Sequence, residues 1–431
     1  MPDMTDAVPK PKASEKAPNG ARPQRPWYML ALLALIYVAG SIDRAVPSVI
    51  VEPLKAEFGL SDGQLGFVTG FAYSIPYALA VLPAGWLIDR FHRRVLLSAA
   101  AAIWSVLTMA GAAAQNFLTL VLARMGVGVT EAPASPGSLS LIGDLFPKER
   151  RTTAISLYYA GTATGQMITF LVGGWLLLQF SWRTLFFVAG VPGIILALLL
   201  FFTCREPKRG QYDEGEAKPP VSYRLAFRAI MDSKSLRHAI VGNMLSTGVS
   251  YAFLVWTISF LVRIHGVSHE YAAIIVGLCV GLMMMVGSVV TGIFTDRHAR
   301  GNAARIAQVP ALGTSIGAVI GIAMCLMPSL TGALVMFGLF AFFMGINTGP
   351  GYTTIVTMTG SNMRGSILSI AKIASVLIGN GGLAFFTGAA SDLIGGPESI
   401  RWALMLTVFF LFWASFHFTK ASRASAHEQA D

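Results

Sequence analysis

Five ionisable residues lie inside long apolar stretches of this 431-residue chain: Asp43, Arg44, Arg124, Glu131 and Lys372. A charged side chain near the centre of a bilayer costs at least about 2.5 to 3.5 kcal/mol on insertion scales, so each of them should face a partner or a water-filled cavity. Acids and bases held in this way can carry protons or bind charged solutes. We therefore treat these five residues as candidates for function.

Asp43 and Glu131 are the residues expected to take up and release protons. At a rise of about 1.5 Å per helical residue, Asp43 and Arg124 should lie roughly 13 Å and 12 Å from the outer ends of their stretches. Similar depths predict that Asp43 pairs with Arg124 or with Arg44, which keeps its carboxylate ionised until a proton or a substrate competes. Glu131 follows Arg124 by about two helical turns, so both should face the same cavity.

Three cations, Arg44, Arg124 and Lys372, are the residues expected to bind a substrate. Lys372 and Arg44 would bracket an anionic headgroup from opposite halves of the molecule. Plainer roles stay open: Asp43 and Arg44 could form a structural ion pair, and Glu131 could be a neutral, hydrogen-bonded core carboxyl. Lys372 could instead extend along its helix to the membrane interface.

Aromatic residues could line the rest of such a cavity. An apolar lining with a few polar groups suits an amphipathic ligand, although aromatic residues at helical spacing usually belong to a packed core. The candidates are Tyr73, Tyr77, Tyr158, Tyr159 and Trp256.

Twelve helices would hold these residues. The chain is 54% hydrophobic and only 13% charged, whereas a soluble domain carries about 25% charged residues. Each apolar stretch is long enough to cross a hydrocarbon core about 30 Å thick, where helices satisfy their own backbone groups. The predicted fold is an all-α membrane protein with twelve transmembrane helices in two pseudo-symmetric six-helix bundles. The expected spans are 27–51, 64–89, 94–113, 116–141, 151–178, 182–204, 237–264, 271–296, 304–326, 330–357, 363–391 and 398–421.

The spans divide the chain into five parts. We expect a disordered cytoplasmic tail without a signal peptide at 1–26, an N-terminal bundle at 27–204, a cytoplasmic linker at 205–236, a C-terminal bundle at 237–421 and a cytoplasmic tail at 422–431. A short amphipathic piece of the linker, from Tyr223 to Ile230, could lie on the membrane surface.

The basic residues predict the orientation. With both termini in the cytoplasm, only four of the 32 Lys and Arg residues, Lys55, Arg183, Arg263 and Arg401, would face outside. This asymmetry agrees with the positive-inside rule and predicts a multi-pass protein of the cell inner membrane.

A repeated motif predicts two parallel repeats of six helices. The segment from Gly85 to Arg94, Gly-Trp-Leu-Ile-Asp-Arg-Phe-His-Arg-Arg, recurs from Gly292 to Arg300 as Gly-Ile-Phe-Thr-Asp-Arg-His-Ala-Arg. Prolines echo each other as well: Pro136 and its neighbour Pro133 lie in the fourth span, and Pro350 lies in the tenth. These three prolines should bend their helices, because each removes a backbone hydrogen bond.

The first copy of the motif resembles the signature of the major facilitator superfamily between helices two and three. Ser41-Ile-Asp43-Arg44, Glu131-Ala-Pro-Ala-Ser-Pro136 and Asp144-Leu-Phe-Pro-Lys-Glu-Arg150-Arg151 narrow the resemblance to the Spinster family. This resemblance implies alternating access and proton-dependent transport of lysophospholipids or sphingoid lipids. Organic-anion symporters share part of the Glu-Ala-x-x-x-Pro pattern, which leaves an organic-anion or drug carrier as the alternative.

The resemblance also implies gates on the cytoplasmic face. Asp89 and Arg93 would latch this face closed, and Asp296 with Arg150 or Arg151 would form a weaker mirror latch. A carboxylate at the end of one helix can meet the N-terminus of a helix from the other half. The simpler reading of the arginines is positive charge that orients the protein.

Other functional classes receive less support. A membrane sensor would need a folded signalling domain, and neither the tails nor the linker could build a core. The sequence has no nucleotide-binding loop, metal-ligand spacing or nucleophile elbow, so we expect no enzyme activity, no cofactor and no metal. The basic residues lie in short connections, which argues against a nucleic-acid partner. The expected partners are a small-molecule or lipid-like substrate, protons and membrane lipids, with the protein as a monomer.

Overall fold

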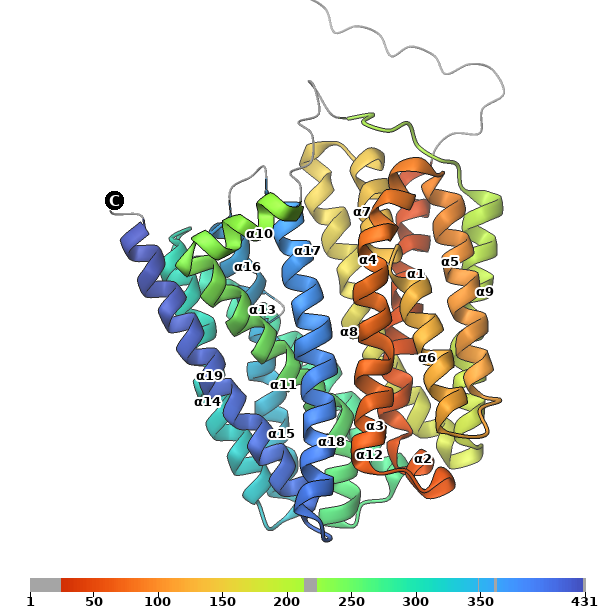
Figure 1. The fold of residues 1–431 in the computed structure, drawn as a ribbon, viewed down its shortest axis with the longest axis vertical. Helices are drawn as coiled ribbons and strands as arrows, with labels where there is room; N and C mark the ends of the chain where they lie inside the picture. The colour runs from red at the N-terminus through yellow and green to blue at the C-terminus, as the bar shows by residue number, and fades with distance from the viewer. Residues whose placement is uncertain (1–24, 213–222, 348, 360–362, 429–431) are drawn as a thin grey trace, which may run out of the picture.

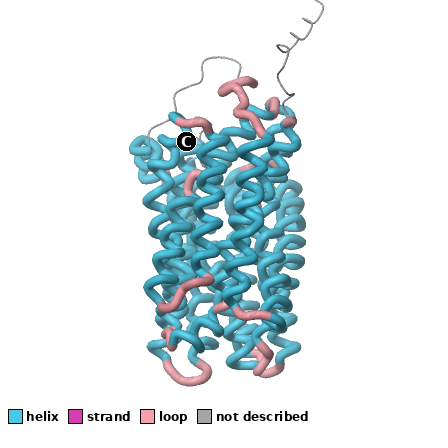
Figure 2. The backbone as a smooth tube through the Cα atoms, turned by 90° about the vertical axis from the view of Figure 1, so that its right-hand side faces the viewer, coloured by secondary structure: helices cyan, strands magenta, loops and turns pink. Residues whose placement is uncertain are grey.

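The computed structural model describes residues 25–212, 223–347, 349–359 and 363–428. In this part of the chain eleven helices are long and apolar enough to cross a membrane. The tenth expected span is interrupted, and its longest helical piece has only 15 residues. Together its pieces supply the twelfth crossing. The prediction of twelve transmembrane helices is confirmed, and Figure 2 shows them running side by side along one axis.

The N-terminal half forms one bundle (Figure 1). Its long helices pack pairwise, with α1 against α8 and α9, and with α5 against α6 and α9. The elements of this half are α1 (Pro26–Val49), α2 (Val51–Phe58), α3 (Asp62–Gly66), η1 (Phe67–Phe71), α4 (Ala72–Arg90), α5 (Arg93–Gly111), α6 (Phe117–Glu131), α7 (Ala134–Leu145), α8 (Lys148–Gln179) and α9 (Trp182–Thr203).

The C-terminal half forms the second bundle, in which α11 and α14 both pack against α19. Its elements are α10 (Tyr223–Asp232), α11 (Lys234–His265), α12 (His269–Leu278), η2 (Cys279–Met283), α13 (Met284–Ala299), α14 (Ala303–Leu326), α15 (Leu330–Met344), η3 (Gly345–Asn347), α16 (Pro350–Thr357), α17 (Arg364–Ala374), η4 (Ser375–Gly382), α18 (Leu383–Ile394) and α19 (Ser399–Glu428).

The two ends of the molecule differ in how the halves meet. We call the end at which α1 begins and α19 ends the terminal end, at the top of Figure 1, and the other the opposite end. The halves contact each other through α3 and α18, through η1 and η4, and through α8 and α12. The short connecting helices α2 and α3 lie at the opposite end, so this is where the halves are joined.

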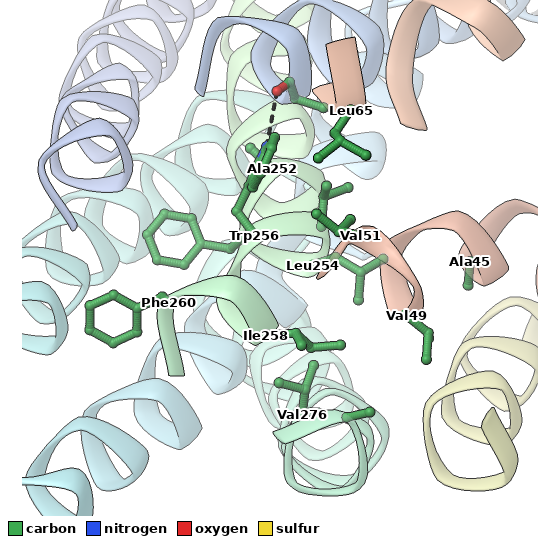
Figure 3. Close-up of a cluster of buried hydrophobic side chains, with 14 of the residues drawn as sticks. Ala45, Val49, Val51, Leu65, Ala252, Leu254, Trp256, Ile258, Phe260 and Val276 are labelled. Atoms are coloured by element: carbon green, nitrogen blue, oxygen red, sulfur yellow. Dashed lines mark hydrogen bonds between the residues drawn. The ribbon is translucent and has the colours of Figure 1, made fainter. Parts of the chain in front are cut away.

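A hydrophobic cluster crosses from one half to the other near this junction (Figure 3). Val49 and Val51 of the N-terminal half belong to the same cluster as Leu254 and Trp256 of α11. The Trp256 ring is fully buried, and its Nε1–H donates to the Ala384 carbonyl at 3.0 Å. The suggestion that Trp256 lines a cavity is therefore wrong, because this ring is part of the packed junction.

The predicted helix breaks are present. Pro133 lies between α6 and α7, with Pro136 in the first turn of α7. Pro350 begins α16, after the short 3₁₀ turn η3 that ends the run of α15. A proline at the start of a helical segment has no N–H to leave unpaired, so these positions suit proline. Prolines do not break every helix here, because Pro47, Pro76, Pro83, Pro192 and Pro310 lie inside helices that continue past them.

Two boundaries differ from the prediction. The last helix continues to Glu428, beyond the expected start of a tail at residue 422. Ser422 and Ser425 are buried, and the Glu428 carboxylate accepts a hydrogen bond from the Ser235 hydroxyl at 2.5 Å, so this extension packs against α11. The expected N-terminal tail lies outside the described residues, except for its last two.

The amphipathic piece of the linker is helix α10. It lies across the terminal end of the C-terminal half (Figure 1), with Ala226 and Ile230 buried against that half. The middle of the linker, 213–222, lies outside the described residues.

Candidate functional site

The first ion pair of the site joins Asp43 on α1 to Arg124 on α6. Arg124 Nη1 lies 3.2 Å from both carboxylate oxygens of Asp43, and the two residues are only 1% and 2% exposed. The Thr108 hydroxyl of α5 donates to Asp43 Oδ1 at 2.5 Å. The predicted pairing of Asp43 is thus present with Arg124 and not with Arg44. A single threonine in an apolar span gives no signal in the sequence, so Thr108 was missed.

The second ion pair joins the next residue of α1, Arg44, to Glu131 at the end of α6. Arg44 Nη2 also donates to the Ser41 hydroxyl at 2.8 Å. The Glu131 side chain is 4% exposed, whereas the Arg44 side chain is 25% exposed. Glu131 Oε2 has no hydrogen-bond partner among the described residues. The carboxylate is therefore held by one cation that itself reaches accessible space.

Gly40 makes room for the second ion pair. A Cβ atom at this position would lie 2.7 Å from Glu131 Oε1, closer than real Cβ contacts come. Glu131 can approach α1 only because Gly40 has no side chain.

Tyrosines surround the two arginines. The Arg44 guanidinium lies 5.6 Å from the centre of the Tyr37 ring, and the Arg124 guanidinium lies 5.7 Å from that of Tyr73. Both distances allow cation–π attraction. Tyr37 stacks on Tyr158 at 4.4 Å.

The other tyrosines differ in exposure. Tyr77 is mostly buried, whereas Tyr159 is 42% exposed. Of the four tyrosines named from the sequence, Tyr159 is the one with an openly accessible ring. Tyr37, which was not named, contacts Arg44 directly.

Lys372 on α17 is an exposed cation within a transmembrane helix. Its side chain forms no hydrogen bond or ion pair with any residue that the structure describes. Its charge acts on the hydroxyls of Tyr37 and Tyr77 in the N-terminal half, and the Arg44 charge acts on the same two tyrosines. Lys372 and Arg44 therefore lie near the same two tyrosines from opposite halves, and neither a hydrogen bond nor an ion pair joins them in the described part of the chain. That they bracket a headgroup stays a prediction.

Lys372 also lines a cavity of about 190 Å³. Most of the lining belongs to the C-terminal half, and it combines a polar group of residues with a larger apolar group. The polar members are Gln166, Thr247, Ser250, Tyr251, Tyr352, Lys372 and Asn380, and the apolar members are Phe253, Leu254, Val280, Met284, Phe337, Phe340, Ala341 and Met344. A single cation above an apolar lining fits an amphiphile with one negative group.

The opposite end is closed by ion pairs and hydrogen bonds between the halves. Arg263 of α11 binds both carboxylate oxygens of Asp62 on α3, at 2.6 Å and 2.9 Å, and it binds Glu52 of α2 at 2.7 Å. The Asp392 carboxylate of α18 accepts from the backbone N–H groups of Asp62 and Gly63, at 2.9 Å and 2.7 Å. These residues, which we call the opposite-end cluster, join α2 and α3 to the C-terminal half.

Neither predicted latch at the terminal end is formed in this conformation. Arg93 is 2% exposed and binds Asp144 at 2.5 Å and Glu206 at 2.7 Å. Both partners belong to the N-terminal half and its linker, so the prediction that Arg93 holds the two halves together is not met here. Asp89 is exposed, and its side chain makes no ion pair with the described residues.

The linker explains the difference. It returns Glu206 to the start of α5, where its carboxylate also accepts from the Arg94 N–H at 2.8 Å. Arg209 donates to the Asp89 carbonyl at 2.6 Å. The linker therefore occupies the Arg93 guanidinium and binds the backbone of Asp89, whereas the Asp89 carboxylate forms no ion pair with the described residues.

The mirror latch is also absent. Asp296 is exposed and forms no ion pair within the described chain, and Arg150 is exposed as well. Arg151 donates to the Gly143 carbonyl at 2.7 Å, within the N-terminal half.

Comparison with known proteins identifies the family. The family model of the Major Facilitator Superfamily matches residues 33–383. The chain belongs to this superfamily. A bacterial homologue of the human lysosomal transporter Spinster, solved in an inward-facing and unoccupied conformation, superposes with a TM-score of 0.86 at 29% identity, over 95% of this chain and 99% of that chain.

Two curated superfamily relatives differ in substrate. The sphingosine-1-phosphate transporter SPNS2 of Mus musculus is 25% identical over 93% of this chain and 79% of its own length. The probable galactarate/D-glucarate transporter of Bacillus subtilis is 26% identical, over 65% of this chain and 66% of its own length, so the match spans slightly less than two thirds of that protein. Fold and relatives are those of major facilitator transporters and not of enzymes.

Proposed function

We propose that this chain is a proton-coupled secondary transporter that moves an anionic amphiphile, such as a lysophospholipid or a sphingoid phosphate, by alternating access of its two bundles. The proposal rests on two cations between the halves, of which one has an ionic partner and the other has none among the described residues. Arg44 is bound to Glu131, whereas Lys372 is exposed and has no ionic partner in the described chain. An anionic headgroup would supply the partner that Lys372 lacks.

Proton coupling follows from competition for Arg44. An anionic substrate and the Glu131 carboxylate would both bind this guanidinium. A proton on Glu131 removes its charge and frees Arg44, so protonation should strengthen binding of the anion, and bound anion should favour protonation by the same factor. Asp43 would act in the same way on Arg124, from which it lies 3.2 Å away.

The lipid-like substrate is supported by the lining of the cavity. The lining has eight apolar residues, six uncharged polar residues and one lysine. Its apolar part suits an alkyl chain, and a sugar acid would leave that part without contacts. The resemblance to a sphingosine-1-phosphate transporter agrees with this. The alternative, a carrier of small organic anions, is favoured by the resemblance to a galactarate/glucarate transporter.

The observed conformation would be open toward the cytoplasm. The opposite-end cluster joins the two halves, and both predicted latches at the terminal end are unformed. We infer that the terminal end faces the cytoplasm, as the distribution of basic residues indicates, and that the protein resides in the cell inner membrane. The breaks at Pro133, Pro136 and Pro350 would let the bundles bend as they rock.

Transport into proteoliposomes tests the proposal. Uptake of a labelled lysophospholipid should increase with an inward proton gradient, and both Asp43→Asn and Glu131→Gln should abolish that dependence. Persistent pH-dependent uptake in both variants would rule out these carboxylates as the coupling groups. A thermal-shift comparison of lysophospholipids with glucarate separates the two substrate classes, because only the true substrate class should stabilise the protein.

A further inference from the structure

A cluster of basic residues that pairs with none of the described acidic residues lies at the terminal end of the C-terminal half, between α11 and α19. His238 Nδ1 and His417 Nδ1 are 2.8 Å apart, and the charges of Arg237 and Lys420 both act on the His238 ring. We call these four residues the α11–α19 basic cluster. Helix α19 runs along the outer edge of the molecule (Figure 1), far from the site between the halves.

No acidic residue in the described part of the chain neutralises this cluster. Among the described residues, no carboxylate acts on either histidine ring, and neither Arg237 nor Lys420 forms an ion pair. Glu428, which ends α19, is held by the Ser235 hydroxyl at 2.5 Å. Arg237 is half-buried, and burying an unpaired charge is costly, so the cluster is suited to an external anion.

Exposed aromatic rings adjoin the cluster. Trp413 and Phe416 of α19 are each 52% exposed, with ring centres 6.0 Å and 5.6 Å from that of His417. Lys420 Nζ lies 5.5 Å above the Phe416 ring. In a membrane-spanning helix such exposed rings contact lipid. Arg237 lies roughly 5 Å from the start of α11, which places the cluster at the level of the lipid headgroups.

We propose that the α11–α19 basic cluster binds the phosphate of an anionic phospholipid, whose acyl chains lie on Trp413 and Phe416. The Arg237 guanidinium and the Lys420 ammonium are positively charged, so both can donate hydrogen bonds to the negatively charged oxygens of a phosphate. In an Nδ1–H···Nδ1 bond one histidine donates and the other accepts, which leaves the pair with one Nε2–H to donate to the phosphate. This inference does not depend on which solute is transported.

Native mass spectrometry of the full-length protein tests the proposal, with phosphatidylglycerol and phosphatidylcholine as probes. The wild type should bind phosphatidylglycerol more tightly than phosphatidylcholine. In the double variant Arg237→Gln/Lys420→Gln the affinity for phosphatidylglycerol should fall by roughly thirtyfold, because each basic residue near an anionic lipid surface contributes about fivefold. Binding of phosphatidylcholine should be unchanged, which also shows that the variant is folded.

Two further variants keep the test sharp. The charge-preserving pair Arg237→Lys/Lys420→Arg should keep the preference for phosphatidylglycerol. Arg297→Gln/Arg305→Gln removes two exposed charges from the same end of the same half and should also keep it. The proposal would be overturned if this control lost as much affinity for phosphatidylglycerol as Arg237→Gln/Lys420→Gln. It would also be overturned if Arg237→Gln/Lys420→Gln still preferred phosphatidylglycerol to phosphatidylcholine as strongly as the wild type does. If soluble glycerol phosphate displaced the lipid, the proposal of a lipid ligand would be wrong, and the cluster would be a site for free phosphate.

Discussion

Arg263 and Asp62 form a two-point ion pair between the halves, with contacts of 2.6 Å and 2.9 Å at the end opposite the chain termini. Asp62 is 2% exposed. It also accepts a hydrogen bond from the Ser391 hydroxyl at 2.7 Å, and its N–H donates to Asp392. One residue of the short helix α3 therefore binds α11 and α18 together, so the state of this carboxylate should decide whether the opposite end is closed.

Asp62→Asn should open the opposite end. Removing one partner of a buried ion pair costs about 3–5 kcal/mol, because the other charge stays behind. Here Arg263 would keep only Glu52. We expect spin labels on α3 and α18 to move apart in the variant, as measured by double electron–electron resonance, and a cysteine placed beside them to react faster with a polar reagent.

The matched control for Asp62→Asn is Glu398→Gln. Glu398 pairs with Arg401 at 2.9 Å at the same end of the molecule, but its side chain is 52% exposed. Such a pair contributes no more than about 1 kcal/mol, so label distances should stay as in the wild type. If Asp62→Asn left the distances unchanged too, the pair with Arg263 would not be what holds this end closed.

Gly70→Ala should weaken the same closure by steric contact. A Cβ at Gly70 of η1 would lie 2.6 Å from the Gly381 carbonyl oxygen of η4, and backbone cannot swing aside as a flexible side chain can. Overpacking of this kind costs about 1–3 kcal/mol. We expect a lower midpoint of thermal unfolding together with a more open opposite end. Gly292→Ala, where a Cβ meets nothing within 4 Å, should change neither.

The twelve helices could be predicted from the sequence because burial in lipid demands long apolar runs. Prolines were a less specific guide, because Pro133 and Pro350 lie at breaks whereas Pro192 and Pro310 lie inside continuous helices. Asp43 and Arg124 could be predicted as partners because charge is so costly in a span that each needs a neighbour at its own depth. The same reasoning cannot find Asp62 and Arg263, because charges at span ends are ordinary and carry no information about their partners.

The latch residues show a second limit. The repeated motif indicates that Asp89 and Arg93 matter, but a sequence does not specify which conformation is populated. In this structure Arg93 is bound by Asp144 and Glu206. Glu206 lies 113 residues along the chain from Arg93, in a linker whose path depends on the packing of α9 and α5.

Glu131→Gln should remove the pH dependence of substrate binding while keeping the substrate bound. On the proposed mechanism, a proton taken up by Glu131 at low pH would release Arg44, so affinity for an anionic amphiphile should rise as the pH falls. In the variant Arg44 is free of the carboxylate at every pH, so affinity should be high and flat. Binding measured by microscale thermophoresis across a pH series checks this. An affinity that still rises at low pH would place the proton on another group.

Lys372→Ala should weaken binding of an anionic amphiphile without altering its pH dependence, because Lys372 has no carboxylate partner in the described chain whose protonation could affect it. Loss of one charge-assisted contact should cost about 1.5–3 kcal/mol, roughly ten- to a hundredfold in Kd. Lys372→Arg should recover much of that loss. Lys234→Ala, which removes an exposed lysine from the start of α11, serves as the control and should leave Kd unchanged. If Lys372→Ala weakened the binding of a neutral monoacylglycerol as much as the binding of the anionic amphiphile, the defect would lie in the shape of the cavity and not in recognition of charge.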